Sequence, residues 1–438
     1  MQLRHTLGLF ILLFSFQGIA AEKSKAQIPE GVTHIIEVGA STREQRSAVA
    51  DLGYALEEIR SDKVFIYGNK KDVELLKKTG LQVSADEVQA RWFQIDEALE
   101  WRYSSYDQVL ERMNALVAAA PDLVSLYSIG QTHEGRDIVA IRIGASTLTE
   151  AQINGVPQMV YMGCHHAREH MSVEVPLMFA EYLVNNYATN DEIARLVNSR
   201  ETFIIPVLNV DGHKHDYTDG VRGQMWRKNR RQNANGSFGV DLNRNYGYKW
   251  GTGGSSTSPG SDTYMGTEPF SEPETAAVRD FLSGLDRLKA TLDFHSFSEL
   301  ILYPWGYTYD RVGETDGTLE DRQVFEKMGA TMAQWNNYTP QTGSDLYIAS
   351  GTLFDWGYGE LGLMSFTFEL SPRSMWEGGF YPNPNTIPQA FQDNINPMLY
   401  MLEMADDPTR ALREEAPSFL TTPAKSGLPI ASFKDLSL

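Results

Sequence analysis

Residues 159–169 read MVYMGCHHARE, and this stretch joins a short apolar run to a cluster of polar side chains. The apolar run, 159–162, is typical of a strand buried inside a sheet. His166 and Glu169 follow it three residues apart, and at a strand-to-helix turn this spacing lets an imidazole and a carboxylate face one point. The segment therefore predicts an α/β unit whose strand leads into two possible metal ligands.

Two later segments have the same form. Residues 292–296 read LDFHS, so that His295 leaves the end of a strand. Residues 366–370 read FTFEL, so that Glu369 interrupts an apolar strand. In open α/β sheets, ligands collect at the carboxyl ends of the strands. All three segments are therefore expected to bring their polar side chains to the same edge of one sheet.

Two histidines and one glutamate are a ligand set of catalytic zinc, with a fourth position open to water. We expect His166, Glu169 and His295 to bind one Zn²⁺, and Glu369 to be a separate base beside the metal. Each signal alone has another interpretation, because an H-x-x-E pair is often a solvated turn. His295 could be a hydrogen-bonded core histidine, and Glu369 could pair with a buried arginine. Their order and their place at strand ends favour the metal site.

Two neighbours of His166 are expected to have other roles. Successive side chains of extended backbone point in opposite directions, so His165 is assigned to packing or to the surface. Cys164 is the one cysteine of the chain, so no internal disulfide is possible. Its apolar surroundings predict a small buried packing residue.

The composition is that of a folded chain that does not bind nucleic acid. Hydrophobic residues make up 42% of the 438 residues and aromatic residues 11%, which argues against disorder. The net charge of −19 disfavours a nucleic-acid partner, because phosphates require a basic surface.

Residues 1–20 have the features of a signal peptide, with a basic start at Arg4 and His5 and small residues before Ala21. The apolar run between them, 7–16, is too short to span a bilayer, and no later segment could cross one. We therefore expect an exported protein, secreted or periplasmic, without a membrane span.

The rest of the chain divides into three parts. Residues 21–101 hold a small α/β module, folded over about 33–85, and a charged linker. In residues 102–405 strands and helices alternate, which predicts one large mixed β-sheet flanked by helices. Residues 406–438 are charged and then contain Pro and Ser, which predicts a weakly ordered tail.

Two elements of the large domain follow β-type and helical patterns after the first buried strand. Residues 173–187 are predicted to form a helix, in which Pro176 is tolerable only in the first turn. Residues 203–208 are predicted to form a strand.

The segments around the candidate metal ligands make the chain resemble the pancreatic-type zinc carboxypeptidases, the A/B family, over roughly 103–402. The matching segments are HARE at 166–169, WRK at 226–228, GVDLNRN at 239–245, HS at 295–296, Tyr347, ASG at 349–351, DW at 355–356 and FTFE at 366–369. The resemblance implies a zinc-dependent exopeptidase that hydrolyses the C-terminal peptide bond of peptides and proteins. Residues 33–85 resemble the family's ferredoxin-like pro-segment, which inhibits the enzyme until it is cleaved off.

The resemblance also implies a role for each matching residue. Zinc is held by His166, Glu169 and His295, Glu369 is general base and then general acid, Arg227 holds the developing oxyanion, Asn243, Arg244 and Tyr347 grip the terminal carboxylate of the substrate, Arg168 is an accessory substrate-binding arginine, and Asp241 orients His166. The chemistry suits these residue types. A carboxylate beside water takes its proton, an arginine near the carbonyl stabilises transition-state charge, and a guanidinium fork matches a carboxylate.

Substrate preference in the family depends on one residue at the base of the pocket for the departing side chain. The aligned residue here is Phe354, which predicts apolar or aromatic C-terminal residues and rejection of basic ones. Asp345 and Glu299 lie near in sequence and could restore tolerance for basic residues. Removal of the pro-segment requires a cut before about residue 103, for which Arg91 and then Arg102 are the candidates.

Three rival functions make different demands on the sequence. An inactive relative would lack a ligand or the base, and none is missing. A hydrolase of the same fold that acts on another bond, such as a cell-wall stem peptide or an N-acyl amino acid, stays open. A serine hydrolase would need a G-x-S-x-G turn, which the sequence does not contain.

Overall fold

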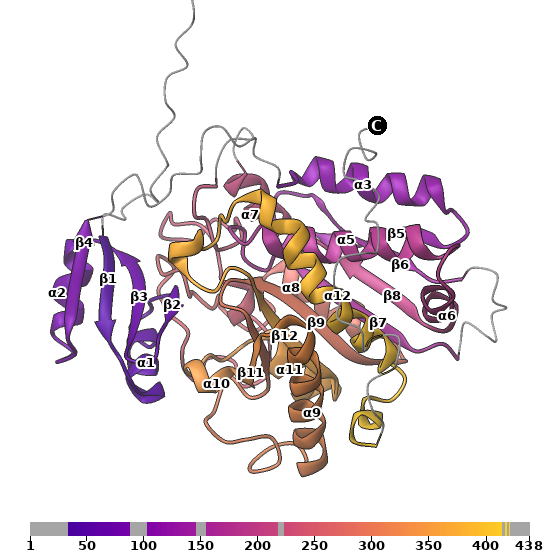
Figure 1. Ribbon diagram of the computed structural model, residues 1–438. Coiled ribbons are helices and arrows are strands. Elements are labelled where there is room, and N and C mark those ends of the chain that lie inside the picture. The colour runs from indigo at the N-terminus through magenta and orange to yellow at the C-terminus, as the bar shows by residue number, and fades with distance from the viewer. Residues whose placement is uncertain are drawn as a thin grey trace, which may run out of the picture.

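The computed structural model describes residues 34–87, 103–145, 155–217 and 223–413, together with Pro417 and Leu420. Two bodies with separate hydrophobic cores lie side by side, a small N-terminal domain and a large domain (Figure 1). No helix within these ranges has the length and apolar character needed to cross a membrane. The proposed signal peptide and the candidate cleavage sites, Arg91 and Arg102, lie outside the described residues.

The N-terminal domain is a four-stranded antiparallel sheet with two helices. Its elements are β1 (His34–Gly39), α1 (Arg43–Ala50), β2 (Glu58–Ile59), β3 (Lys63–Gly68), α2 (Lys70–Lys77) and β4 (Val83–Glu87). The spatial order β2-β3-β1-β4 with this βαββαβ sequence is the ferredoxin-like arrangement. Thr42 and Gln45 form a capping box at the start of α1, which explains where this helix begins. The predicted small α/β domain is confirmed.

The large domain is built on an eight-stranded mixed sheet in the order β11-β10-β12-β9-β7-β8-β6-β5. Its strands are β5 (Val124–Gln131), β6 (Asp137–Ile143), β7 (Gln158–Gly163), β8 (Glu201–Ile205), β9 (Leu288–Ser296), β10 (Leu300–Tyr303), β11 (Thr339–Thr342) and β12 (Met364–Leu370). The central strands β12, β9, β7 and β8 are parallel, and the flanking β6 and β10 run antiparallel to their inner neighbours. The predicted mixed sheet is confirmed.

Helices flank this sheet. They are α3 (Tyr106–Ala119), α5 (Met171–Asn186), α6 (Asp191–Ser199), α7 (Val210–Asp216), α8 (Pro273–Ser283), α9 (Leu319–Asn336), α10 (Gly343–Leu346), α11 (Leu353–Leu361) and α12 (Ile387–Glu403), with the short 3₁₀ helices η2 (Leu242–Arg244), η3 (Met375–Glu377), η4 (Pro384–Thr386) and η5 (Pro408–Leu412). Every residue of β7 is buried, which requires cover on both faces of the sheet. Helix α12 packs against both α5 and α9 and lies in front of the sheet in the view of Figure 1.

Two predicted boundaries were wrong for reasons that involve proline. Helix α5 begins at Met171, because the turn that carries Glu169 runs directly into it, so Pro176 lies inside the helix rather than in its first turn. Strand β8 ends at Ile205, because Pro206 lacks the N–H that a central strand needs.

The predicted tail begins with a packed element. In η5 the Ala411 side chain is buried against the main core, and so is Leu420. The remaining residues beyond Arg413, apart from Pro417, lie outside the described part of the chain.

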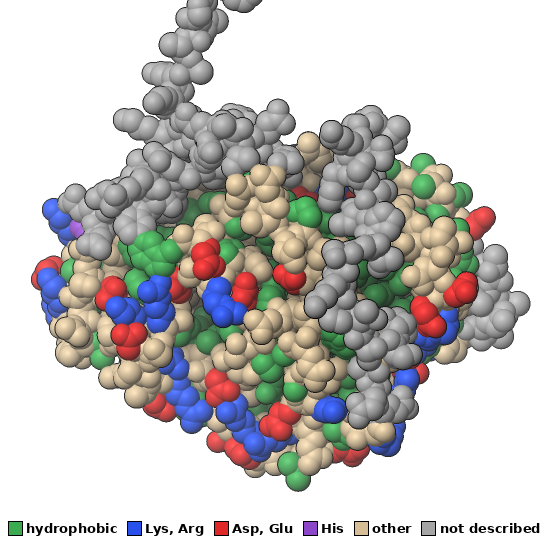
Figure 2. Space-filling model, in the orientation of Figure 1, with side chains coloured by type: hydrophobic (Ala, Val, Ile, Leu, Met, Phe, Trp, Pro, Cys, Tyr) green, Lys and Arg blue, Asp and Glu red, His purple; other side chains and the backbone are tan. Residues whose placement is uncertain are grey.

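The parallel strands bring the predicted site residues to one edge. In the register of the sheet Glu369 of β12 lies opposite His295 of β9, and β7 beside them leads directly to His166. The molecular face seen in Figure 2 carries acidic and basic side chains interspersed with apolar ones, so the negative net charge is not gathered into one patch on that face.

Candidate zinc centre and active site

Three buried side chains converge at the carboxyl ends of β7 and β9. His166 Nδ1 lies 2.7 Å from Glu169 Oε1, and His295 Nδ1 lies 2.9 Å from Glu169 Oε2. The two Nδ1 atoms are 3.1 Å apart. The predicted ligands therefore turn one donor atom each toward a common point, as the resemblance implies.

The backbone explains this convergence. At Cys164 the chain adopts a left-handed conformation with φ 57°, which bends it sharply at the end of β7. Ser172 Oγ accepts a hydrogen bond from the Cys164 N–H, and the Glu169 N–H donates to His166 O. The turn is thus closed on both sides, and it holds His166 and Glu169 together.

The charges of the three side chains depend on one another. Burial alone would raise the pKa of Glu169, but the imidazoles of His166 and His295 hold it below its ordinary value. Burial, assisted by the Arg227 charge, lowers the pKa of His166. A carboxylate that stays ionised and an imidazole that stays neutral are the forms in which these groups bind a metal.

A second layer orients His166. Its Nε2 lies 3.1 Å from Asp241 Oδ1, and Arg227 Nε and Nη2 donate to Asp241 Oδ2 at 3.1 and 2.9 Å. Burial would raise the pKa of Asp241, but the charges of Arg227 and His166 hold it well below its usual range. The predicted partnership of Asp241 with His166 is present. Arg227 also extends Nη1 to 3.8 Å from Glu169 Oε1, so its guanidinium borders the metal-binding point.

Glu369 stands on β12 across from His295 and lines the same cavity. Among the described residues none donates a hydrogen bond to its carboxylate, which is partly exposed to the cavity. Burial raises the pKa of Glu369 to about 8, and the negative charge of Glu169 adds to this effect while His295 opposes it. Glu369 is thus near the ligands without being one of them.

Asn243, Arg244 and Tyr347 meet on one wall of the cavity. Arg244 donates through Nε to Gly254 O, through Nη1 to Asn243 O and through Nη2 to the Tyr347 hydroxyl, at 3.1, 2.7 and 3.2 Å. Asn243 Oδ1 accepts from the Leu353 N–H at 2.9 Å, which fixes the orientation of the amide. The structure therefore brings together the three residues predicted to bind a terminal carboxylate.

Arg168 does not line this cavity. Its Nη2 donates to Glu57 of the N-terminal domain at 2.6 Å, and its guanidinium lies 4.2 Å from the centre of the Phe380 ring. Glu57 itself lines the cavity and is buried. The accessory arginine is therefore occupied by a carboxylate of the preceding domain, a contact that the sequence did not reveal.

The cavity has a volume of about 650 Å³, and Phe354 is one of the residues that line it. The Phe354 ring packs so close to the backbone of Gly306 and Gly343 that a Cβ at either glycine would lie 2.9 or 2.7 Å from its Cζ. These two glycines therefore make room for the ring.

The two acidic residues that could restore tolerance for basic substrates are engaged elsewhere. Asp345 is paired with Arg311 at 2.8 and 2.9 Å, and Glu299 with Arg373 at 2.8 Å. Neither lines the cavity, whose described acidic residues are Glu57, Glu169 and Glu369.

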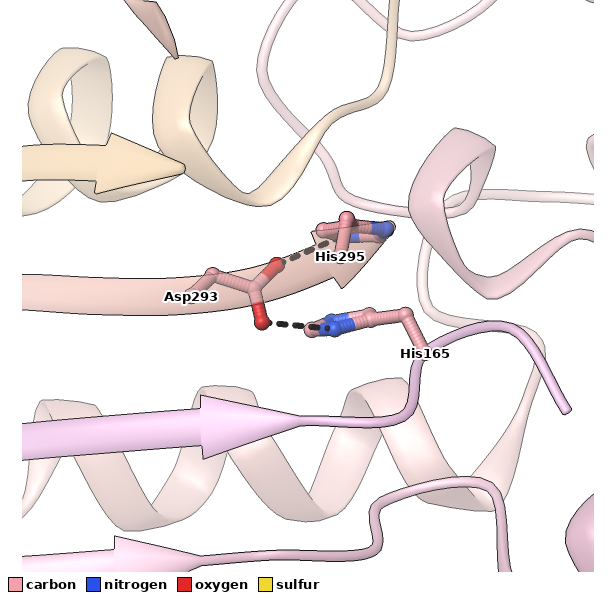
Figure 3. A group of neighbouring side chains, drawn as sticks. All are labelled: His165, Asp293 and His295. Carbon is pink, nitrogen blue, oxygen red and sulfur yellow. Dashed lines mark hydrogen bonds and ion pairs between the residues drawn. The ribbon is translucent and has the colours of Figure 1, made fainter. Parts of the chain in front are cut away.

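Three further buried residues belong to the centre and were not assigned to it from the sequence. Asp293 lies between His295 and His165, and His165 Nε2 lies 2.7 Å from the Tyr246 hydroxyl (Figure 3). The expected packing role of His165 agrees with this interior position. The signal for Asp293 was in the sequence, because residues i and i+2 of a strand point to the same face.

A second group of possible donors, His133, Glu272 and Glu274, lies apart from this cavity. Both Glu272 oxygens are already bonded, one to Arg231 and Ser271 and the other to His133 and Asn229. A guanidinium in contact with Glu272 makes this group a poor host for a cation.

Comparison with known proteins agrees with the geometry. The model of the zinc carboxypeptidase family matches residues 109–397. The chain belongs to the zinc carboxypeptidase family. A zinc carboxypeptidase of Saccharothrix mutabilis subsp. capreolus is 32% identical over 409 residues, 88% of this chain and 92% of that protein. Carboxypeptidase A2 of Rattus norvegicus is 30% identical over 312 residues, 70% of this chain and 71% of that protein.

Carboxypeptidases are also found among the solved structures that are similar in fold. The crystal structure of carboxypeptidase A from Helicoverpa armigera matches with a TM-score of 0.71 at 25% identity, over 88% of this chain and 100% of that one. The similarity in fold therefore extends over most of both chains.

The residues of this carboxypeptidase fit the zinc ion that its family uses. Two imidazole nitrogens and one carboxylate converge, and each ring turns its second nitrogen to an outer carboxylate, Asp241 or Asp293. That pairing is usual for histidines that bind a metal. The set His166, Glu169 and His295 leaves further positions for water and substrate, as catalytic zinc requires.

Proposed function

We propose that this carboxypeptidase hydrolyses the last peptide bond of peptides and proteins, prefers apolar or aromatic C-terminal residues, and is exported as an inactive precursor. The observation that carries the preference is that Phe354 lines the cavity, while the acidic residues described in that lining, Glu57, Glu169 and Glu369, have other assigned roles. The family supplies the peptidase activity itself.

In the proposed mechanism the charged groups have separate tasks. Zinc held by His166, Glu169 and His295 supplies a Lewis acid that acidifies water and polarises a carbonyl. Glu369 takes the proton of the attacking water, because its carboxylate is near the ligands and accepts no other hydrogen bond among the described residues. It then returns the proton to the departing amine. Arg227 stabilises the negative charge that develops on the carbonyl oxygen.

Recognition of a free C-terminus is assigned to the wall formed by Asn243, Arg244 and Tyr347. Arg244 presents a guanidinium whose position is fixed by two backbone carbonyls, and Asn243 and Tyr347 lie beside it. A bidentate contact to a carboxylate gives both affinity and orientation. The distance of this wall from the metal ligands then sets which peptide bond is cut. Arg168 joins this wall once Glu57 has withdrawn.

The pocket assignment predicts a substrate order. Among blocked dipeptides that end in Phe, Leu, Lys or Glu, the processed enzyme should cleave those ending in Phe and Leu about 100-fold faster than that ending in Lys, because an unpaired ammonium would be desolvated against the Phe354 ring. Measurement of kcat/KM for the four substrates, with and without a chelator, checks this. Faster cleavage of the Lys substrate would contradict it.

Phe354→Asp should reverse the order. A carboxylate at this position would pair with a basic side chain, and we expect the Lys-to-Phe ratio of kcat/KM to rise by about 100-fold. Phe281→Asp, on α8 outside this cavity, is the matched control and should leave the ratio unchanged. An unchanged ratio in Phe354→Asp would remove Phe354 from the specificity pocket.

The precursor assignment rests on contacts of the N-terminal domain around the cavity. Besides the Glu57 pair with Arg168, Arg46 donates to Asp345 O and Leu346 O, and the Ile348 N–H donates to Ser47 Oγ. These bonds lie on both sides of Tyr347. Residues of this domain between Ala55 and Ser61 also line the cavity, so the domain borders the site and bonds to the backbone next to a residue assigned to substrate binding.

Cleavage between residues 87 and 103 should raise kcat/KM by at least about tenfold. In the uncut chain, Glu57→Ala should give part of that gain, because a buried Arg168 without its partner weakens the docking of the domain. Glu74→Ala, a highly exposed position on the same domain, is the matched control. An uncut chain that is as active as the cut one would contradict the precursor assignment.

Export is supported by residues 1–20 alone. Their basic start, apolar run and small residues are those of a secretory signal, so the mature enzyme is placed outside the cytoplasm, secreted or periplasmic. N-terminal sequencing of the protein recovered outside the cells, starting at or near Ala21, would test this.

A further inference from the structure

Asp293 lies between two imidazoles behind the zinc ligands. One carboxylate oxygen, Oδ2, is 2.8 Å from His295 Nε2, and the other, Oδ1, is 3.0 Å from His165 Nδ1 (Figure 3). The His165 and His295 rings stack nearly parallel, 5.4 Å apart with an angle of 21° between them. All three side chains are almost fully buried.

The sheet places two of these side chains, and the turn that follows β7 places the third. Asp293 and His295 are two residues apart on β9, so they project to the same face. In the register of the parallel pair Asp293 lies beside Met162 of β7, and His165 follows β7 after the sharp bend at Cys164. Two neighbouring strand ends therefore deliver the three groups to one place.

The proton on His295 requires an acceptor at this position. Nδ1 faces Glu169 and His166, so a metal among them uses the Nδ1 lone pair and leaves the ring proton on Nε2. In the described part of the chain two side chains approach Nε2: Asp293 Oδ2 at 2.8 Å and Asn243 Nδ2 at 3.3 Å. The Asn243 oxygen already accepts from Leu353, so its amide offers only N–H groups. Asp293 is the acceptor.

Asp293 is itself held in position. His165 contacts its second oxygen from the stacked ring, and the other nitrogen of His165 lies 2.7 Å from the Tyr246 hydroxyl. Tyr246 is buried and stacks on Trp356. The row Tyr246, His165, Asp293 and His295 thus connects the packed interior to the metal ligand.

We propose that Asp293 is a positioning residue that fixes the metal-binding tautomer and orientation of His295, and that His165 and Tyr246 hold Asp293 in place. His295 then has its own outer carboxylate, as His166 has Asp241. The inference depends on the zinc site and not on the proposed preference or precursor state. Outer partners of this kind change metal affinity by about 10–100-fold when they are removed.

The test is zinc affinity of the apo protein, measured by competition with a chromophoric chelator. Asp293→Leu keeps the size of the side chain but offers no acceptor, and we expect its affinity to fall by about 10–100-fold. Asp293→Asn keeps an acceptor oxygen and should retain more affinity than Asp293→Leu. His165→Phe keeps the stacked ring but not the contact to Asp293, and it should fall between Asp293→Leu and the wild type. Asp280→Leu, at a highly exposed position on α8, is the matched control.

Two further measurements distinguish a role in positioning the ligand from a role in packing alone. The melting temperature of each apo variant reports packing, and the visible spectrum of the cobalt-substituted protein reports ligand geometry. The inference requires a changed cobalt spectrum together with weaker zinc binding in Asp293→Leu. Zinc affinity within about twofold of the wild type in Asp293→Leu would overturn it.

An equal loss of zinc affinity in Asp293→Asn and Asp293→Leu would also overturn the inference, because the acceptor oxygen kept in Asp293→Asn would then make no difference. Should Asp293→Leu not fold, His165→Phe decides in its place: weaker zinc binding with a changed spectrum supports the inference, and wild-type behaviour overturns it.

Discussion

Glu369→Gln should bind zinc as tightly as the wild type and lose turnover by a factor of about 10²–10⁴. Glutamine has nearly the shape of glutamate, but its amide cannot take a proton from water. Glu369 lies opposite His295 in the sheet yet is not one of the three converging ligands, so its replacement leaves the metal site intact. The measurements are kcat on a blocked dipeptide and the zinc content of the purified, processed protein.

The control for this change is Glu360→Gln, an exposed position on α11. It should alter neither zinc content nor kcat. Normal hydrolysis by Glu369→Gln would show that another group is the base. Loss of zinc from Glu369→Gln would show instead that the carboxylate is a ligand.

Arg244→Ala should lower kcat/KM for a substrate with a free C-terminus by about 30- to 5000-fold, which corresponds to the 2–5 kcal/mol lost when one partner of a buried charge pair is removed. The same substrate with a C-terminal amide carries no charge for Arg244 to bind. We therefore expect the preference for the free acid over the amide to shrink strongly. Parallel kcat/KM measurements on the acid and the amide check this.

Two more variants sharpen the result. Arg244→Lys keeps the charge but not the planar fork, so it should recover only part of the lost activity. Arg413→Ala, at a well-exposed position after η5, should behave as the wild type. An unchanged acid-to-amide ratio in Arg244→Ala would mean that the terminal carboxylate is bound elsewhere.

The candidate metal ligands could be predicted from the sequence because strand geometry largely determines where their side chains lie. An apolar strand that ends in a ligand fixes both the direction of the side chain and the edge of the sheet where it lies. His166, His295 and Glu369 all follow this rule, and their strands β7, β9 and β12 are neighbours. The pairing of Asp241 with His166 followed from the common habit of metal histidines.

Other features depended on information that local patterns do not contain. The pair between Glu57 and Arg168 joins two domains, and only the docking of those domains brings it about. The neutralisation of Asp345 by Arg311 is likewise a contact between distant segments. Asp293 was a different case. The sequence shows that it shares a strand face with His295, but it does not show whether Asp293 pairs with His295 or with another buried polar group.

The buried thiol of Cys164 can report when the turn that carries His166 and Glu169 becomes exposed to solvent. Cys164 is buried, its Sγ lies 3.7 Å from His166 O, and burial raises its pKa well above the ordinary value. A reagent that needs a thiolate is thus excluded while the turn is closed. Because Cys164 is the one cysteine of the chain, labelling by such a reagent would report only events that expose this turn to solvent.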